Sequence, residues 1–170
     1  KNAIVVAVGC YAQVAKSELE KMEEIDCILG TNEKKEIVKY VEKFIEEKEL
    51  SIELDDVLHN PEYTDFGTIT YTEKTRAVIK VQDGCDRFCS YCIIPYARGH
   101  VRSRKIESVI EEIKAIAKKG IKEVVITGIH VASYGKDLKE KKALIDLLEE
   151  INKIDGIERI RLGSLEPTLI

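Results

Sequence analysis

The sequence predicts an α/β fold built on parallel strands. Short runs rich in β-branched residues alternate with amphipathic segments of helical period, which is the layout of β/α folds. The runs are too short to cross a membrane, and a composition of 44% hydrophobic and 34% charged residues is typical of soluble globular proteins. The net charge of −4 argues against a general nucleic-acid binder, so any RNA contact would come from a local patch or from outside this chain.

The first part of the chain predicts two strands and two helices. Residues 3–8 are continuously apolar and β-branched, as in a strand buried on both faces, and GCYAQ follows as a loop. Residues 16–24 predict a helix, and DCILG predicts a short strand closed by Gly30. Residues 33–49 predict an amphipathic helix with charges on one face. Its apolar face carries Ile37, Val41, Phe44 and Ile45.

Residues 50–75 differ in character from their surroundings. They contain a proline, a glycine and several Asp and Thr residues, and they show no helical period. Such a stretch is typical of a linker, here with one edge strand. We therefore place a domain boundary near residue 72, which divides the chain into residues 1–72 and 73–170.

The second part predicts three strands and two helices in alternation. This order implies parallel strands with right-handed crossovers, in an open sheet or in part of a barrel. In either arrangement the loops at the carboxyl ends of the strands carry the site. Those loops hold the cysteine-rich segment, TGIHVASYG and GSLEP, and we expect them to meet at one face. The strands are residues 77–82, 123–128 and 159–164, and the helices are residues 106–119, which Gly120 terminates, and 139–153.

Three of the five cysteines lie together in DGCDRFCSYCIIPYARG, as Cys85, Cys89 and Cys92. No stretch has the pattern of a signal peptide, so we expect the cysteines to be cytosolic. In the cytosol a tight cysteine cluster more often binds metal or reacts than forms disulfides. Zinc usually takes four ligands from two cysteine pairs; no second pair exists, although His100 or His130 could be a fourth ligand. A [4Fe–4S] cluster fits better, because three thiolates leave one iron open for a ligand.

A run of basic residues follows the cysteines. On composition alone such a run is a solvated loop. Its arginines also suit planar anions such as phosphate or carboxylate. The run comprises Arg98, His100, Arg102, Arg104 and Lys105.

The C-x3-C-x2-C spacing, with an aromatic residue before the last cysteine and a place after the first strand of a β/α run, resembles the radical S-adenosylmethionine superfamily. The resemblance implies that Cys85, Cys89 and Cys92 are catalytic ligands of a [4Fe–4S] cluster whose open iron is chelated by S-adenosylmethionine. It also implies that Tyr91 lies beside the adenine. One electron then cleaves the cofactor to a 5′-deoxyadenosyl radical, which abstracts hydrogen from an unreactive carbon.

A longer match narrows this resemblance to the methylthiotransferases, which insert sulfur and a methyl group into a C–H bond. GCDRFCSYCIIPYARGHVRSR carries their I-P, R-G and S-R pairs, and VVAVGCYAQ and ILGTNEKKEIV resemble the end of their N-terminal domain. The implied fold is a truncated Rossmann-like N-terminal methylthiotransferase domain with its linker over 1–72, followed over 73–170 by the first βα units of a partial radical-SAM (β/α) barrel.

The family also holds an auxiliary [4Fe–4S] cluster in its N-terminal domain, through three cysteines. Only Cys10 matches one of these positions, and the other two would lie before Lys1. We therefore expect an internal fragment that is inactive alone. Without the resemblance, Cys10 would be interpreted as a small buried residue; the resemblance favours the ligand role instead. Cys27 lies inside a predicted strand, and we expect it to be a core residue.

The family modifies isopentenyl-adenosine or threonylcarbamoyl-adenosine in tRNA, or an aspartate of a ribosomal protein. TGIHVASYG places His130 where the other two types typically carry Gln with Asn or Asp, and RIRLGSLEP also resembles the threonylcarbamoyl-adenosine type. The resemblance therefore implies methylthio transfer to C2 of N6-threonylcarbamoyladenosine 37, beside the anticodon, with one S-adenosylmethionine as radical source and one as methyl donor. The other two substrates stay open as alternatives, and a zinc-stabilised RNA-binding module is the alternative from another class.

Further site residues follow from their positions after the predicted strands. Thr127, Gly128 and His130 are expected near the methionine end of the cofactor, although a tight turn with a solvent-facing histidine is the simpler interpretation. Ser164 and Glu166 could contact the ribose or the amino group, and Glu166 could instead cap the chain before Pro167. Candidates for contact with tRNA phosphate or the cofactor carboxylate are Arg98, Arg102 and Arg104. The implied partners are the tRNA anticodon stem-loop, an electron donor such as flavodoxin or ferredoxin, and a sulfur source, in the cytoplasm and without a membrane.

Overall fold

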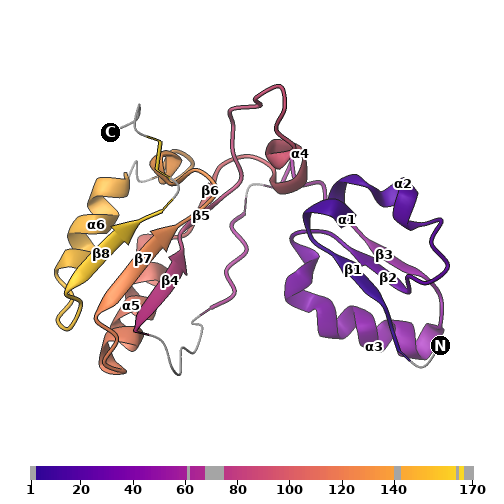
Figure 1. Ribbon diagram of the computed structural model, residues 1–170, viewed down its shortest axis with the longest axis horizontal. Helices are drawn as coiled ribbons and strands as arrows, with labels where there is room; N and C mark the ends of the chain where they lie inside the picture. Colours follow the sequence, from indigo (N-terminus) through magenta and orange to yellow (C-terminus); the bar gives the residue numbers. More distant parts are fainter. Residues whose placement is uncertain (1–2, 61, 68–74, 140–142, 164, 167–170) are drawn as a thin grey trace. The chain divides into compact units, whose positions relative to one another are not determined.

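The computed structural model describes residues 3–60, 62–67, 75–139, 143–163 and 165–166. The chain forms two compact units, each built from two stretches of sequence (Figure 1). The first unit is Lys1–Thr64 with Arg87–Gly99, and the second is Asp65–Asp86 with His100–Ile170. The predicted boundary near residue 72 lies outside the described residues and stays a prediction. No helix of the described residues is long and apolar enough to span a membrane.

The first unit contains a three-stranded parallel sheet with β2 (Cys27–Leu29) between β1 (Val6–Val8) and β3 (Ser51–Glu53). β2 is fully buried, as expected for a central strand, and β3 is the edge strand predicted within the linker. The expected burial of the first strand on both faces is wrong, since Val8 is 44% exposed. The reason is that β1 lies at the edge of the sheet. It packs against the short helix α1 (Cys10–Val14), whereas the long helix of the unit packs on the central strand β2.

Helices of the first unit begin and end at different residues from those predicted. GCYAQ is not a loop: Gly9, with φ 109°, turns the chain directly from β1 into α1. The predicted helix over 16–24 is shortened to α2 (Lys16–Leu19).

The amphipathic helix predicted over 33–49 is confirmed. It begins as the 3-10 turn η1 (Glu33–Glu36), continues as α3 (Ile37–Glu47), and ends at Lys48 in the left-handed conformation. Ile45, however, is 55% exposed and does not belong to the covered face.

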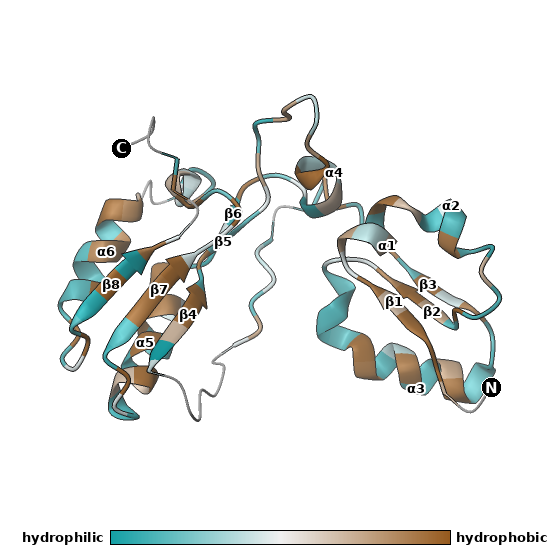
Figure 2. Ribbon diagram, in the orientation of Figure 1, coloured by the Kyte–Doolittle hydropathy of each residue, from teal (hydrophilic) through white to brown (hydrophobic). Residues whose placement is uncertain are grey.

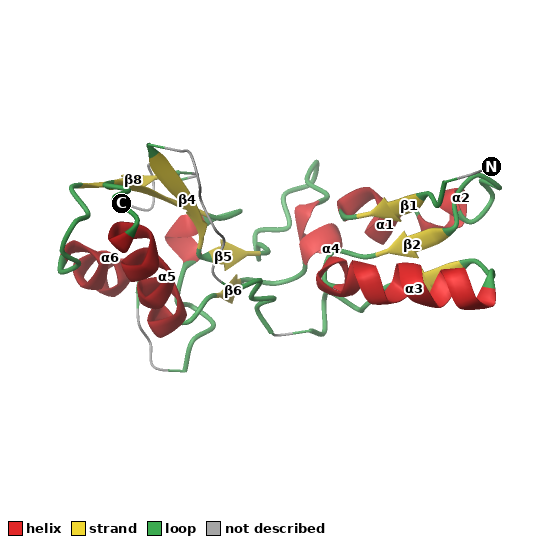
Figure 3. Cartoon of the chain, turned by 90° about the horizontal axis from the view of Figure 1, so that it is seen from below, coloured by secondary structure: helices red, strands yellow, loops and turns green. Residues whose placement is uncertain are grey.

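The second unit contains a parallel sheet in the order β4-β7-β8, so the predicted three strands and their direction are confirmed. β4 and β7 are hydrophobic along most of their length (Figure 2). The two predicted helices lie on one side of this sheet (Figure 3), and their apolar residues form a single core with it. The elements are β4 (Arg76–Lys80), α5 (Ile106–Lys118), β7 (Glu123–Thr127), α6 (Leu144–Asn152) and β8 (Arg159–Leu162).

A small antiparallel ladder extends the carboxyl end of β4 toward the site. β5 (Gln82–Asp83) pairs with β6 (Arg102–Ser103), so the strand predicted over 77–82 is divided between two sheets. The Val81 amide nonetheless still donates to the Thr127 carbonyl of β7, at 2.9 Å. The ladder therefore joins the start of the cysteine-rich segment to the main sheet of the second unit.

Candidate active site

The three clustered cysteines are free thiols, and none of them is buried. The Cys92 amide donates to the Cys89 carbonyl at 2.9 Å, which closes a turn between these two residues. Cys89 and Cys92 belong to the first unit and Cys85 to the second, so neither unit contains the whole triad. Across the described parts of the chain, no three His, Cys, Asp or Glu side chains converge on a preformed metal site.

The donor set nonetheless fits an iron–sulfur cluster. Such clusters are held by thiolates from compact loops, and these three thiols are reduced, reachable and within one short segment. Cys27, by contrast, is fully buried in β2, as predicted.

The loop between Cys85 and Cys89 carries a strained residue. Phe88 has φ 45°, a left-handed conformation that bulky residues rarely adopt. Its ring packs edge-to-face on Tyr96, with the ring centroids 5.6 Å apart. This contact holds the bend of the loop. Tyr91 is 91% exposed, so its ring is open to a planar ligand.

The end of the cysteine-rich segment is anchored within the first unit. It forms the short helix α4 (Ile94–Arg98), which packs against α1. The Nε of Arg98 donates to the Sγ of Cys10 at 3.0 Å, and the Oγ1 of Thr31 donates to the Ala97 carbonyl at 3.1 Å. Sequence reasoning missed the contact between Arg98 and Cys10, because 88 positions separate the two residues.

Gln82 joins two of the predicted site loops in the second unit. Its side chain is fully buried. The Oε1 accepts from the His130 amide at 2.7 Å, while the Nε2 donates to the carbonyls of Asp83 at 2.6 Å and Gly84 at 2.7 Å. Sequence reasoning missed this residue too, although a glutamine at the end of the apolar run AVIKV was the available signal.

His130 lies where the loops after β7 and β8 meet. Its Nδ1 lies 2.6 Å from the Oγ of Ser133, and its Nε2 lies 3.3 Å from the Oε2 of Glu166. The expectation that these two loops meet is therefore confirmed. The side chain of His130 is only 12% exposed, so the simpler interpretation of a solvent-facing histidine is wrong. Ser164 lies outside the described residues.

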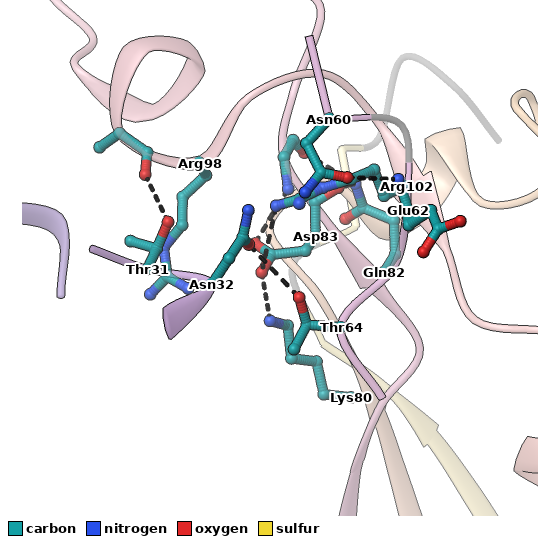
Figure 4. A network of polar contacts seen from close by, with 12 residues as sticks. Thr31, Asn32, Asn60, Glu62, Thr64, Lys80, Gln82, Asp83, Arg98 and Arg102 are labelled. Atoms are coloured by element: carbon teal, nitrogen blue, oxygen red, sulfur yellow. Dashed lines mark hydrogen bonds and ion pairs between the residues drawn. The ribbon is translucent and has the colours of Figure 1, made fainter. Parts of the chain in front are cut away.

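The interpretation of the basic run as a solvated loop is wrong for Arg102 and Arg104, because both residues are buried. The Nε of Arg104 donates to Asp65 at 3.0 Å, and its Nη1 forms an ion pair with the buried Glu112. Lys80 and Arg102 both approach the Asp83 carboxylate (Figure 4). The composition of the run did not reveal these internal carboxylate partners, because composition does not show which side chains pair in the fold.

Burial alone would raise the pKa of Asp65. Hydrogen bonds from Ser108 and the Gly67 amide, together with the charge of Arg104, more than offset this effect and hold the pKa below its usual value. Asp65 is therefore an ionised partner that ties the segment before β4 to Arg104, which follows β6, and to Ser108 of α5.

The three free thiols at C-x3-C-x2-C spacing and the parallel β/α unit around them are features of one class of protein. Residues 79–170, more than half of the chain, match the family model described as the Radical SAM superfamily, and the chain belongs to that superfamily. Its relatives include methylthiotransferases of three kinds, in agreement with the resemblance seen in the sequence.

The threonylcarbamoyladenosine tRNA methylthiotransferase MtaB of Aquifex aeolicus is 45% identical over 164 residues, which cover 96% of this chain and 40% of that protein. The ribosomal protein uS12 methylthiotransferase RimO of Acetivibrio thermocellus is 40% identical, covering 94% of this chain and 36% of that protein. The tRNA-2-methylthio-N(6)-dimethylallyladenosine synthase of Thermotoga petrophila is 40% identical, covering 99% of this chain and 37% of that protein. The chain thus spans less than half the length of these relatives.

Proposed function

We propose that the chain acts within a radical S-adenosylmethionine methylthiotransferase that modifies N6-threonylcarbamoyladenosine 37 of tRNA. The observation that carries the proposal is the set of three free thiols, Cys85, Cys89 and Cys92, within the superfamily match. The same proposal includes a cytoplasmic setting, the tRNA anticodon stem-loop as substrate, an electron donor and a sulfur source.

In this proposal the three thiolates hold a [4Fe–4S] cluster. When bound, the cluster supplies the electron for reductive cleavage of S-adenosylmethionine. The exposed ring of Tyr91 stacks on the adenine, while the strand-end loop Thr127–His130 and Glu166 hold the methionine end. The carbonyl groups of this loop suit an ammonium group, and the partly buried pair of His130 and Glu166 keeps the loop in place.

Cys10 is proposed as one ligand of an auxiliary [4Fe–4S] cluster. Support comes from its position: it begins α1 at the carboxyl end of β1, it is half-buried, and the Nε of Arg98 donates to its sulfur. Hydrogen bonds to cluster thiolates are a common means of tuning such centres.

Of the three arginines predicted to bind RNA or the cofactor, Arg102 and Arg104 are buried, and Arg98 donates to Cys10. Their positions give no support to a tRNA phosphate contact, so we propose that the RNA surface lies mainly elsewhere in the protein.

Removal of one thiol tests the cluster assignment. In full-length protein reconstituted without oxygen, we expect Cys85→Ala to abolish cleavage of S-adenosylmethionine and to lower the iron and sulfide content. Cys27→Ala is the matched control, because it removes a buried thiol from the core of the other unit, and it should retain cleavage. Cleavage by Cys85→Ala at the parental rate would contradict the assignment. Stoichiometric zinc without iron or sulfide in the parent would favour the zinc-stabilised RNA-binding module.

The substrate is tested by mass spectrometry of tRNA nucleosides from a deletion strain. We expect the methylthio group to disappear from threonylcarbamoyl-adenosine and to remain on isopentenyl-adenosine. The 45% identity to the threonylcarbamoyladenosine enzyme of Aquifex aeolicus supports this expectation. Loss from isopentenyl-adenosine, or from the ribosomal protein, would assign the chain to another kind of methylthiotransferase.

A further inference from the structure

We infer that Gln82 is a positioning residue that fixes the first cysteine of the motif relative to the loop Gly128–His130, and thereby sets the affinity for S-adenosylmethionine. The inference rests on the proposed function, in which Cys85 holds the cluster and Gly128 and His130 lie at the methionine end of the cofactor. All of these residues belong to the second unit, so the argument stays within one compact body.

Gln82 is an unusual residue to find fully buried. Glutamine is mostly exposed in proteins, and a buried amide costs free energy unless it is hydrogen-bonded. Here the oxygen accepts one hydrogen bond and the nitrogen donates two, so both donors of the amide are used. The backbone of Gln82 is itself held in β5, opposite Ser103. Gln82 is therefore fixed both through its backbone and through its side-chain amide.

On one side this amide fixes the approach to Cys85. Gly84, the residue before the cysteine, has φ 72°. Its amide donates to the Asp83 Oδ1 at 2.9 Å, and its carbonyl accepts from the Gln82 Nε2 at 2.7 Å. Both polar groups of Gly84 are thus occupied, and the direction in which Cys85 leaves the turn is set by residues 82 and 83.

On the other side the amide fixes the loop after β7. Its oxygen binds the His130 amide. Gly128 lies so close that a Cβ at this position would be 2.8 Å from both the backbone oxygen and the Oε1 of Gln82. Only a glycine permits this approach. The ring of His130 then contacts Ser133 and Glu166, so a shift of Gln82 would reach the residues proposed to hold the cofactor.

The test uses the full-length protein, reconstituted without oxygen. Gln82→Met keeps the length of the side chain and removes all three hydrogen bonds. We expect the iron and sulfide content to remain and the KM for S-adenosylmethionine to rise about 10- to 100-fold. We also expect S-adenosylmethionine to change the electron paramagnetic resonance spectrum of the reduced cluster less than in the parent, a signature that a merely structural role would not move.

Gln13→Met is the matched control. Gln13 also bridges two loops, with its Oε1 accepting from the Thr31 amide at 3.1 Å and its Nε2 donating to the Asp55 carbonyl at 2.9 Å, but it belongs to the first unit. We expect this variant to lose stability while keeping the KM for S-adenosylmethionine.

Gln82→Glu gives a second readout and covers the case in which the methionine variant fails to fold. The carboxylate can still accept from His130 but cannot donate to Asp83 and Gly84, and protonation would restore one donor. We expect the KM of this variant to fall toward the parental value as the pH is lowered. The profile is compared with that of the parent at each pH, because His130 and Asp83 lie next to this position.

The outcomes separate the two proposals. A parent that holds no cluster contradicts the proposed function and this inference with it. An active parent together with Gln82 variants of unchanged KM, pH profile and spectrum contradicts the inference alone. Loss of iron in proportion to activity in both Gln82 variants would also overturn it, because Gln82 would then support cluster assembly rather than cofactor binding.

Discussion

Gly99 illustrates how single residues restrict the cysteine-rich segment. It has φ 76°, which glycine adopts readily and other residues do not. Within its own unit it also lies so close to Val57 that a Cβ would be 2.0 Å from the Val57 carbonyl oxygen. The R-G pair of the sequence therefore has a steric reason: Arg98 contacts Cys10, and the next residue must have no side chain.

Gly99→Ala should therefore destabilise the protein by more than backbone strain alone. The matched control is Gly120→Ala, since Gly120 has a similar φ of 83° but nothing within 4 Å of its Cβ position. We expect the control to cost roughly 1–2 kcal/mol of unfolding free energy and Gly99→Ala to cost more, because the Val57 backbone must also move. Denaturant unfolding of the two variants measures the difference, and equal costs would contradict the steric argument.

At this scale, sequence reasoning succeeded where a residue's own type determined its environment. The prediction that Cys27 is a core residue is confirmed, because a small thiol inside an apolar strand has few alternatives. The solvated interpretation of Arg104 was wrong, since its partners Asp65 and Glu112 are distant in sequence or hidden in a helix. Local composition contains no information on such pairing.

At the scale of elements, hydrophobic periodicity identified the strands and helices of the second unit. α5 buries Ile106, Val109 and Ile113, as its period predicted, and Gly120 follows its end. Boundaries were less accurate where backbone conformation intervened. The turn at Gly9 produced α1, which the pattern had suggested was a loop. The exposure of β1 depends on which helices cover it, and this is a tertiary property.

Asp65 gives an element-scale prediction, because it ties the segment before β4 to α5 and to Arg104, which follows β6. Its pKa is lowered in the folded state, so its contribution to stability is full above the unfolded pKa of about 3.9 and is lost as the pH falls through the lower folded value. We expect the unfolding midpoint of the parent to exceed that of Asp65→Asn near neutral pH, and the gap to narrow below about pH 4. A gap that is constant from pH 7 to pH 3 would contradict this linkage.

At the scale of the whole molecule, the chain crosses between its two units more than once. Residues 87–99 group with the first unit although they follow a strand of the second. The contacts that place them there include Thr31 with Ala97, which are 66 positions apart, and Cys10 with Arg98. No local pattern reports contacts of this separation. The cysteine motif that indicates the chemistry was therefore easy to find in the sequence. The structure was needed to assign each of its thiols to a unit.

The close approach of Gly128 to Gln82 has a consequence for how this site can vary during evolution. A side chain at residue 128 would meet the amide of residue 82, so residue 128 cannot gain a side chain while residue 82 stays as it is. A lineage that gains a methyl group at 128 should also carry a shorter or more yielding residue at 82, which removes one of the two obstructing atoms. The two positions, 46 apart in the chain, are thus expected to be inherited as a pair.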